Sequence, residues 1–396
     1  IAYVNSTYNG AFCLDVSNPK QPKSIAYAIP WNEKENRPDF MASLAIVDDV
    51  IYAAGYGVGL WVIPAKGFAK RVTPRTNMPV PPEPIASDLP SNEELLTNFA
   101  FYKTDGQIGA VCKEPRDNSL WVASGKDGLH RIEIRDNQPV CLKKYPTPGA
   151  AYDVKRAGDL LLCAQADKGL AIYKVDQDAN IKEIGRFTTI QSIRQVVVSN
   201  NAHWAIAKVG NGKLFFLDLT RPESPRVAFK DSYPLGIMYG REIVQSVTNE
   251  GIASAFFWGF GFAWYDLSGD TPKKLGLKPA KSGSLFGGAI QNGKLYYSQR
   301  NGFYVFDLLD TSPLDKESFC SIPKFEGGGK IFMNGTIACV MNRRNGSIST
   351  FDFANLKEPK LLKQYKVKGH PDPGIFLNDG RMIIPCGYAG LMIEKR

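Results

Sequence analysis

Three histidines, at positions 130, 203 and 370, limit the acid–base chemistry open to this chain of 396 residues. The first follows a leucine and the second precedes a tryptophan, both within strand-like apolar runs, so we expect them to pack rather than to catalyse. His370 lies in a proline-containing stretch, residues 368–373, which is typical of a loop. It is therefore the best candidate for a general acid or base.

An enzyme acting on an acidic polysaccharide needs a cation to neutralise the substrate carboxylate and a group that moves a proton. Arg194, Tyr233 and His370 have the side-chain types for these roles. The sequence does not indicate that the three converge. We therefore keep a polysaccharide lyase or glycoside hydrolase as an alternative hypothesis, with no firm catalytic residue.

The usual motifs for metals, nucleotides and nucleophilic serines are absent from the sequence. The seven cysteines include no Cys-x-x-Cys pair, and most lie in apolar runs, which favours buried free thiols over a metal site. A disulfide between Cys13 and Cys386 is the lesser alternative. We expect no cofactor and no metal.

The chain carries a net charge of +9, which favours anionic partners. The basic residues are spread out, with no run of five, so we expect no nucleic-acid binding and instead an anionic glycan or another surface protein. The longest apolar-rich stretch, residues 252–264, is shorter than the ~20 residues that span a bilayer, so we expect no transmembrane segment. The chain opens at Ile1 in a strand-like run, from which we expect a removed leader and a secreted, periplasmic or cell-surface location.

A repeat organises the whole chain. A glycine followed by an alternating apolar strand recurs nine times. We call these positions the anchor glycines: Gly10, Gly59, Gly128, Gly169, Gly212, Gly261, Gly302, Gly346 and Gly390. Successive anchors lie 41 to 49 residues apart, except for the 69 residues between Gly59 and Gly128. Further strand-like runs and turn signals surround each anchor, so each unit is predicted to be a four-stranded antiparallel meander.

Aspartates end five of the anchor strands, at Asp15, Asp218, Asp266, Asp307 and Asp352. One carboxylate per unit keeps the five far apart, so we expect them to cap turns rather than to bind metal.

The best repeat, residues 10–19 followed by Pro22, resembles the LVIVD repeat of bacterial and archaeal cell-surface proteins, and weaker copies extend the resemblance over nearly the whole chain. The resemblance implies a β-propeller. It implies little about function, because most proteins with this repeat have no assigned activity.

We therefore predict an all-β chain that forms a single β-propeller over residues 1–396. A ring of blades buries both faces of every sheet and leaves only short edges. The ring has eight blades if the two chain ends share one blade, nine if they do not, and seven if one unit is discounted.

The long interval is predicted to hold an insertion at about residues 64–107. Its prolines exclude regular structure over residues 75–84, and Ser91 with Glu94 forms a capping box that predicts a short helix. A lid over one face of the ring and an inert surface loop are both compatible with this pattern.

Ligands of propellers usually bind where the loops between blades meet the central channel. Aromatic, basic and acidic residues in these loops are candidates for ligand binding: Trp31, Arg37, Tyr145, Tyr233, Lys281 and Asp372. Loops just before the anchors add further aromatic and charged residues: Tyr56, Lys126, Asp127, Asp167, Lys168, Trp258, Arg300, Arg343, Arg344 and Tyr388. Stacking rings beside charged donors suit a sugar that carries a carboxylate. The preferred hypothesis is a non-catalytic, extracytoplasmic binding or scaffolding propeller that recognises a glycan at the channel mouth.

Overall fold

The computed structural model describes these residues: 1–6, 10–28, 31–32, 37–38, 41–55, 59–65, 97–210, 213–232, 243–247, 251–257, 261–279, 287–299, 302–308, 319–322, 329–342, 346–367 and 369–396. The chain divides into two compact units, Ile1–Ser87 and Asp88–Arg396. Each unit is described by itself below. No helix among the described residues is long and apolar enough to cross a membrane.

Within its described residues the second unit contains seven four-stranded antiparallel sheets, which we call blades 1 to 7. Each of the first six is a meander of strands consecutive in the sequence. Blades 1 to 3 consist of β10 (Ala110–Lys113), β11 (Leu120–Ala123), β12 (Leu129–Arg135), β13 (Gln138–Tyr145); β14 (Asp153–Ala157), β15 (Leu160–Ala164), β16 (Leu170–Val175), β17 (Ile181–Phe187); and β18 (Ile193–Val198), β19 (Trp204–Val209), β20 (Lys213–Asp218), β21 (Arg226–Ser232). Blades 4 to 6 consist of β22 (Ile243–Val247), β23 (Ile252–Phe257), β24 (Gly261–Asp266), β25 (Lys273–Pro279); β26 (Gly287–Gln291), β27 (Lys294–Gln299), β28 (Gly302–Asp307), β29 (Phe319–Ser321); and β30 (Lys330–Asn334), β31 (Ile337–Asn342), β32 (Ser347–Asp352), β33 (Lys360–Lys366).

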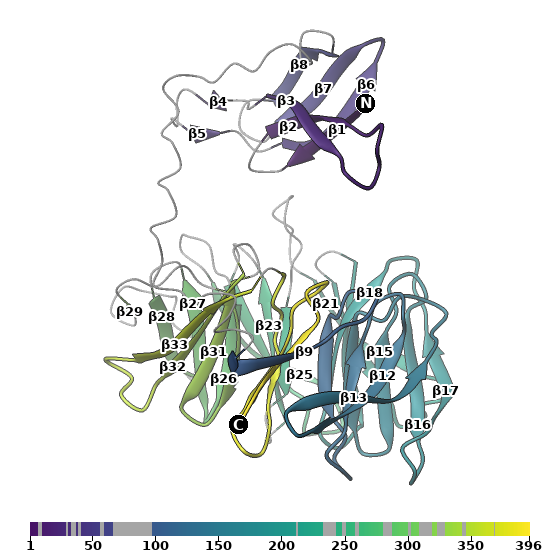
Figure 1. The fold of residues 1–396 in the computed structure, drawn as a ribbon. Helices are drawn as coiled ribbons and strands as arrows, with labels where there is room; N and C mark the ends of the chain where they lie inside the picture. The colour runs from purple at the N-terminus through teal and green to yellow at the C-terminus, as the bar shows by residue number, and fades with distance from the viewer. Residues whose placement is uncertain are drawn as a thin grey trace. The chain divides into compact units, whose positions relative to one another are not determined.

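Blade 7 joins the two ends of this unit. Its first three strands are β34 (Ile375–Phe376), β35 (Met382–Pro385) and β36 (Leu391–Glu394), and its fourth is β9 (Phe99–Tyr102) from the start of the unit. β36 and β9 pair antiparallel, with Leu391 opposite Tyr102 and Glu394 opposite Phe99. The pairing closes the ring, because the strand that precedes blade 1 completes blade 7 (Figure 1).

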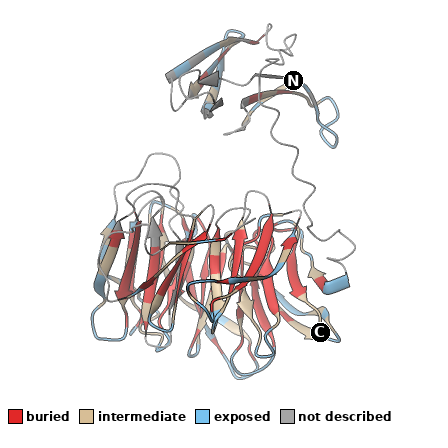
Figure 2. Ribbon diagram, turned by 90° about the vertical axis from the view of Figure 1, so that its left-hand side faces the viewer, coloured by how far each residue is buried: buried red, intermediate tan, exposed pale blue. Residues whose placement is uncertain are grey.

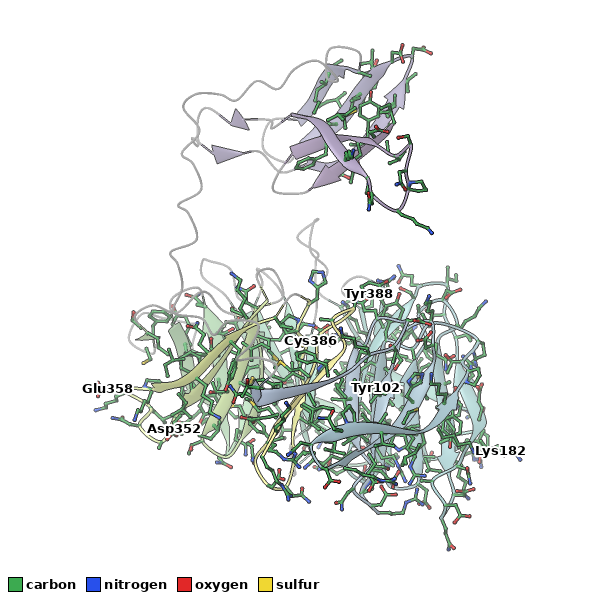
Figure 3. All side chains as sticks on the ribbon, viewed as in Figure 1. Tyr102, Lys182, Asp352, Glu358, Cys386 and Tyr388 are labelled. Carbon is green, nitrogen blue, oxygen red and sulfur yellow. The ribbon has the colours of Figure 1, made fainter. Side chains whose placement is uncertain are left out.

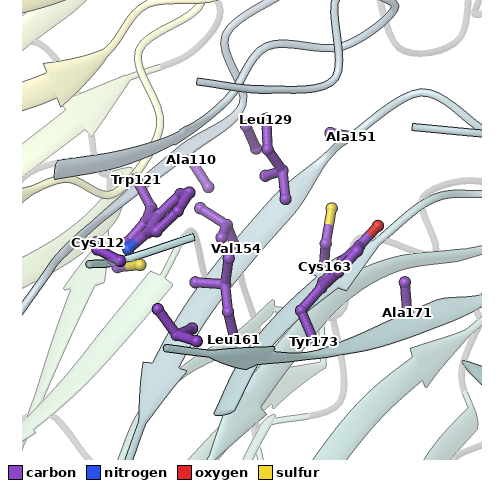
Figure 4. Close-up of a cluster of buried hydrophobic side chains, with 13 residues drawn as sticks. Ala110, Cys112, Trp121, Leu129, Ala151, Val154, Leu161, Cys163, Ala171 and Tyr173 are labelled. Carbon is purple, nitrogen blue, oxygen red and sulfur yellow. The ribbon is translucent and has the colours of Figure 1, made fainter. Parts of the chain in front are cut away.

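The blades stand side by side, and most of their buried residues lie in the sheets themselves (Figure 2). The first strands of neighbouring blades adjoin in order around the ring, and β35 of blade 7 adjoins β10 of blade 1. β15 illustrates the packing: Leu161 and Cys163 belong to the apolar cluster shared with blade 1, whereas Leu162 and Ala164 belong to the cluster shared with blade 3. Figure 4 shows the first of these clusters, with Trp121 of blade 1 near Val154 of blade 2. Such a continuous apolar run is expected for a strand that is buried on both faces.

The anchor glycine has a steric cause. At Gly128 φ is +81°, and a Cβ atom would lie 2.3 Å from the carbonyl oxygen of Tyr145 in the last strand of the same blade. At Gly169 φ is also +81°, and the corresponding oxygen, that of Phe187, would lie 2.2 Å away. Both the left-handed backbone and the close approach of the outer strand therefore require glycine.

The first unit contains two three-stranded sheets and one two-stranded pair within its described residues. The strands are β1 (Ala2–Ser6), β2 (Gly10–Asp15), β3 (Lys23–Ala28); β4 (Trp31–Asn32), β5 (Arg37–Pro38); and β6 (Met41–Val47), β7 (Val50–Gly55), β8 (Gly59–Pro64). Buried side chains from both three-stranded sheets form one apolar cluster that includes Ala11, Cys13, Ile51 and Ala53. The β2–β3 pair also shifts register between Cys13 and Leu14, as the β12–β13 pair does between Arg131 and Ile132.

The predicted all-β class and the four-stranded antiparallel blades are confirmed. The prediction of eight blades, based on a blade shared by the two ends of the chain, is not confirmed. β36 pairs with β9 rather than with the first strands of the chain. The interval interpreted as an insertion at residues 64–107 thus contains the closing strand of the ring. The sequence predicted one domain, whereas the structure divides after Ser87. The helix predicted near Ser91 lies outside the described residues.

Candidate functional site

Three neighbouring joints between blades have the same backbone connection. Gly125 exchanges two hydrogen bonds with Ala151, with N···O distances of 2.9 and 2.8 Å. Ala166 does the same with Ile193, and Gly387 with Ile108, at 2.8 to 3.1 Å. In each case the turn between the second and third strands of one blade is tied to the residue at or near the start of the next blade's inner strand.

These tied turns share one backbone arrangement but carry different side chains. The residue after the tied position is exposed in all three turns. It is Lys126 in blade 1, Asp167 in blade 2 and Tyr388 in blade 7, where the side chain is 74% exposed. We call the end of the ring that carries these residues the turn-tip face. A rigid backbone that holds a cation, an anion and an aromatic ring is suited to recognition. Tyr388 is labelled in Figure 3, above Cys386 on the same turn.

An aromatic ring and a guanidinium meet on the same face. Tyr152 directly follows the tied residue Ala151, and Arg194 directly follows the tied residue Ile193. The Arg194 guanidinium carbon lies 4.9 Å from the centre of the Tyr152 ring, which is cation–π geometry. Arg194 is exposed and Tyr152 is half-buried, so the pair is accessible to solvent.

His370 belongs to this face as well. It is exposed, and its backbone N–H donates to the carbonyl of Cys386 at 3.2 Å, which places it beside the turn that carries Tyr388. Arg194 instead lies at the start of blade 3. The third residue of the proposed catalytic set, Tyr233, lies outside the described residues.

Two of the predicted ligand-binding residues take part in blade packing. The Tyr145 ring lies 5.6 Å from the Trp121 ring, and its hydroxyl donates to the carbonyl of Ala179 in blade 2 at 3.3 Å. Burial raises the pKa of this phenol. Asp372 forms an ion pair with Lys330 of blade 6, and their side chains are 9% and 14% exposed. Both were predicted to lie in loops with accessible side chains, but Tyr145 ends β13 and both side chains point inward.

The remaining predicted residues belong to the first unit or lie outside the described residues. Trp31 and Arg37 lie in the first unit, on the paired strands β4 and β5, where Trp31 is opposite Pro38 and Asn32 is opposite Arg37. Lys281, like Tyr233, lies outside the described residues.

The expectations for cysteine and aspartate can be compared directly with the structure. All seven cysteines are free and five of them are buried, so the alternative disulfide between Cys13 and Cys386 is wrong. The Asp218 carboxylate accepts hydrogen bonds from the Thr220 N–H at 2.8 Å and the Thr220 hydroxyl at 2.6 Å, which lower its pKa. Asp266 and Ser268 repeat this arrangement. The turn-capping role is confirmed at these positions, whereas Asp307 instead pairs with Lys294 at 2.6 Å.

Sequence reasoning missed Tyr152. The backbone bonds between Ala151 and Gly125 hold Tyr152 at the turn-tip face, and bonds between main-chain atoms leave no signal in the residue types. Among the described residues, no group of three or more histidine, cysteine, aspartate or glutamate side chains is placed to hold a metal ion.

Solved structures of similar fold are WD40 propellers. U3-55K aligns with a TM-score of 0.57 and 10% sequence identity, over 76% of this chain and 99% of that chain. The WD40 repeats of RRP9 align with a TM-score of 0.57 and 10% identity, over 78% of this chain and 99% of that chain. The sequence matches no family profile and no curated protein. At this identity the likeness establishes the β-propeller fold alone.

Proposed function

We propose that this protein is a non-catalytic binding or scaffolding propeller whose turn-tip face recognises an anionic glycan outside the cytoplasm. The observation that carries the proposal is the Tyr152–Arg194 pair, an exposed cation over an aromatic ring at 4.9 Å. A sugar ring can stack on the exposed aromatic side chains of this face, and a guanidinium can bind its carboxylate with two parallel hydrogen bonds.

The charge of the chain supports an anionic partner, since a net charge of +9 attracts such ligands over distances of several ångströms. Exposed Lys126 and Lys168 add cations at the same face. The proposed location outside the cytoplasm and the proposed membership of the LVIVD-repeat proteins depend on the resemblance of residues 10–22 to that repeat.

Oligogalacturonate titrated into the protein, followed by calorimetry, tests the proposal. We expect Arg194→Gln to weaken binding about tenfold, because a hydrogen bond to a charged group contributes about 1.5–3 kcal/mol. The matched control is Arg226→Gln. Arg226 is an exposed arginine of the same blade, and it lies at the turn between the third and fourth strands. Failure of acidic glycans to bind, or equal losses in both variants, would contradict the proposal.

The same titration separates this proposal from the alternative lyase or hydrolase. Because His370 is exposed beside the Tyr388 turn, it could reach a polymer bound at the turn-tip face. Time-dependent cleavage of the oligosaccharide that is abolished in His370→Ala would favour the enzyme. Binding without cleavage would favour the non-catalytic propeller.

A further inference from the structure

A cavity opens at the end of the ring opposite the turn-tip face. It lies between β30 of blade 6 and β34 of blade 7, with Lys113 of blade 1 at its side. Its residues Asn334 and Asn378 adjoin the turns between first and second strands, and in an antiparallel sheet these turns lie at the other end from the tied turns. The cavity volume is about 380 Å³, which falls within the range of small-molecule sites.

Five of the nine residues that line the cavity have apolar side chains. The Phe332 and Phe376 rings lie 4.9 Å apart and come from adjacent blades. Met333, Ile375 and Leu377 complete the apolar lining, and all five side chains are half-buried rather than enclosed in the core. An apolar ligand in the cavity would remove these half-exposed side chains from water, which stabilises the bound state.

One cation and two amides form the polar side. The Lys113 ammonium donates to Oδ1 of Asn378 at 2.9 Å. This bond uses one of the three hydrogens of an ammonium and fixes the direction of the side chain. Burial lowers the pKa of Lys113 below its ordinary value, and the nearby Asp379 carboxylate offsets only part of this effect. The Lys113 ammonium is therefore partly desolvated, and an anion bound in the cavity would stabilise its positive charge.

We propose that this cavity binds a small monocarboxylate with an aromatic or aliphatic body. One ammonium with two neutral amides matches one negative charge, whereas a phosphate dianion would require further cations. The Phe332–Phe376 pair would contact the body of the ligand while Lys113 binds its carboxylate. This inference does not depend on the glycan proposal, because it concerns the other end of the ring.

Calorimetric titration of the full chain with 3-phenylpropionate tests the inference, and the uncharged 3-phenylpropan-1-ol measures the apolar contribution alone. We expect the carboxylate to bind more tightly than the alcohol. Lys113→Met keeps the apolar stem of the side chain. It should weaken binding of the carboxylate about tenfold and leave binding of the alcohol unchanged. The matched control is Lys182→Met, at an exposed lysine of β17 that is labelled in Figure 3.

Methyl NMR locates the ligand independently of any variant. The chain has seven methionines, of which Met333 lines the cavity and Met392 is fully buried in blade 7. The carboxylate should shift the Met333 signal strongly and that of Met392 little. Absence of binding, an unshifted Met333 signal, or equal weakening by Lys182→Met would overturn the inference. Each of these outcomes leaves the Arg194 experiment unaffected.

Discussion

The Tyr102 hydroxyl and Nδ1 of His130 lie 2.7 Å apart and share a hydrogen bond across the joint that closes the ring. Tyr102 belongs to β9 of blade 7, and His130 belongs to β12 of blade 1. His130 is fully buried, and its Nε2 atom has no hydrogen-bond partner among the residues that the structure describes. A buried imidazole in which one ring nitrogen lacks a hydrogen-bond partner resists protonation, because its positive charge would be poorly solvated.

We predict that acid weakens this joint. Burial, together with the nearby Lys144, lowers the pKa of His130 from its ordinary value of 6.5. Below that value the unfolded chain binds the proton and the folded chain does not, so the free energy of unfolding falls as the pH decreases from 7 to 5. Urea denaturation at the two pH values should show this decrease, and His130→Gln should reduce it.

Tyr102→Phe is the control for the hydrogen bond. It removes the hydroxyl but leaves the imidazole buried, so the free energy of unfolding should fall by about 1 kcal/mol while its pH dependence persists. A pH dependence that is unchanged in His130→Gln would show that another group is responsible.

A second prediction concerns Glu114, whose carboxylate is buried between blades 1 and 2. It accepts hydrogen bonds from Arg156 Nε at 2.9 Å, Arg116 Nε at 2.7 Å and the Trp121 indole at 3.0 Å. The Arg156 side chain is 3% exposed. Glu114→Ala would leave this arginine as an uncompensated charge, so we expect a loss of about 3–5 kcal/mol in denaturant unfolding.

The matched control is Glu133→Ala, which breaks the exposed Glu133–Arg135 pair of the same blade and should cost about 0–1 kcal/mol. Similar decreases in the free energy of unfolding of the two variants would contradict the role given to burial. The pH dependence is a further check. Although burial opposes ionisation, the three donors lower the pKa of Glu114 from 4.5 to about 2. The contribution of the Glu114 carboxylate to the free energy of unfolding is therefore complete above pH 4.5 and is lost as the pH falls toward 2.

A third prediction tests the steric cause of the repeat. Gly169→Ala places a Cβ atom 2.2 Å from the Phe187 carbonyl oxygen, whereas Gly380→Ala has almost the same φ, +84°, with no atom within 4 Å. Gly380→Ala should lower the free energy of unfolding by about 1–2 kcal/mol from the left-handed backbone alone. Gly169→Ala should lower it clearly more. Equal losses would mean that φ, and not the outer strand, explains the anchor glycine.

The strands were predictable because their causes are local. The anchor glycine, the alternating residues after it and the capping aspartates such as Asp218 and Asp266 each act within one blade. Closure is not local, since Phe99–Tyr102 pairs with residues near position 393. Nothing in four apolar residues indicates that distant partner, so the interval around them was interpreted as an insertion.

The candidate site was only partly predictable for a related reason. The repeat placed Arg194, His370 and Tyr388 near the loops between strands; the structure has His370 and Tyr388 in loops and Arg194 as the second residue of β18. It could not specify the direction of a loop side chain. Tyr145, at the end of β13, and Asp372, in a loop, both turn inward, to Trp121 and Lys330. Tyr152, which the sequence did not single out, stacks with Arg194 because both follow tied residues.

The most direct test of the account is the thermal unfolding of two shortened chains, residues 88–396 and residues 104–396, followed by circular dichroism. The first keeps β9 and the second lacks it. If β9 closes a ring of seven blades, residues 88–396 should fold and unfold in one cooperative transition, and residues 104–396 should be strongly destabilised or aggregate. A chain of residues 88–396 that fails to fold, or a chain of residues 104–396 that is equally stable, would contradict closure by β9.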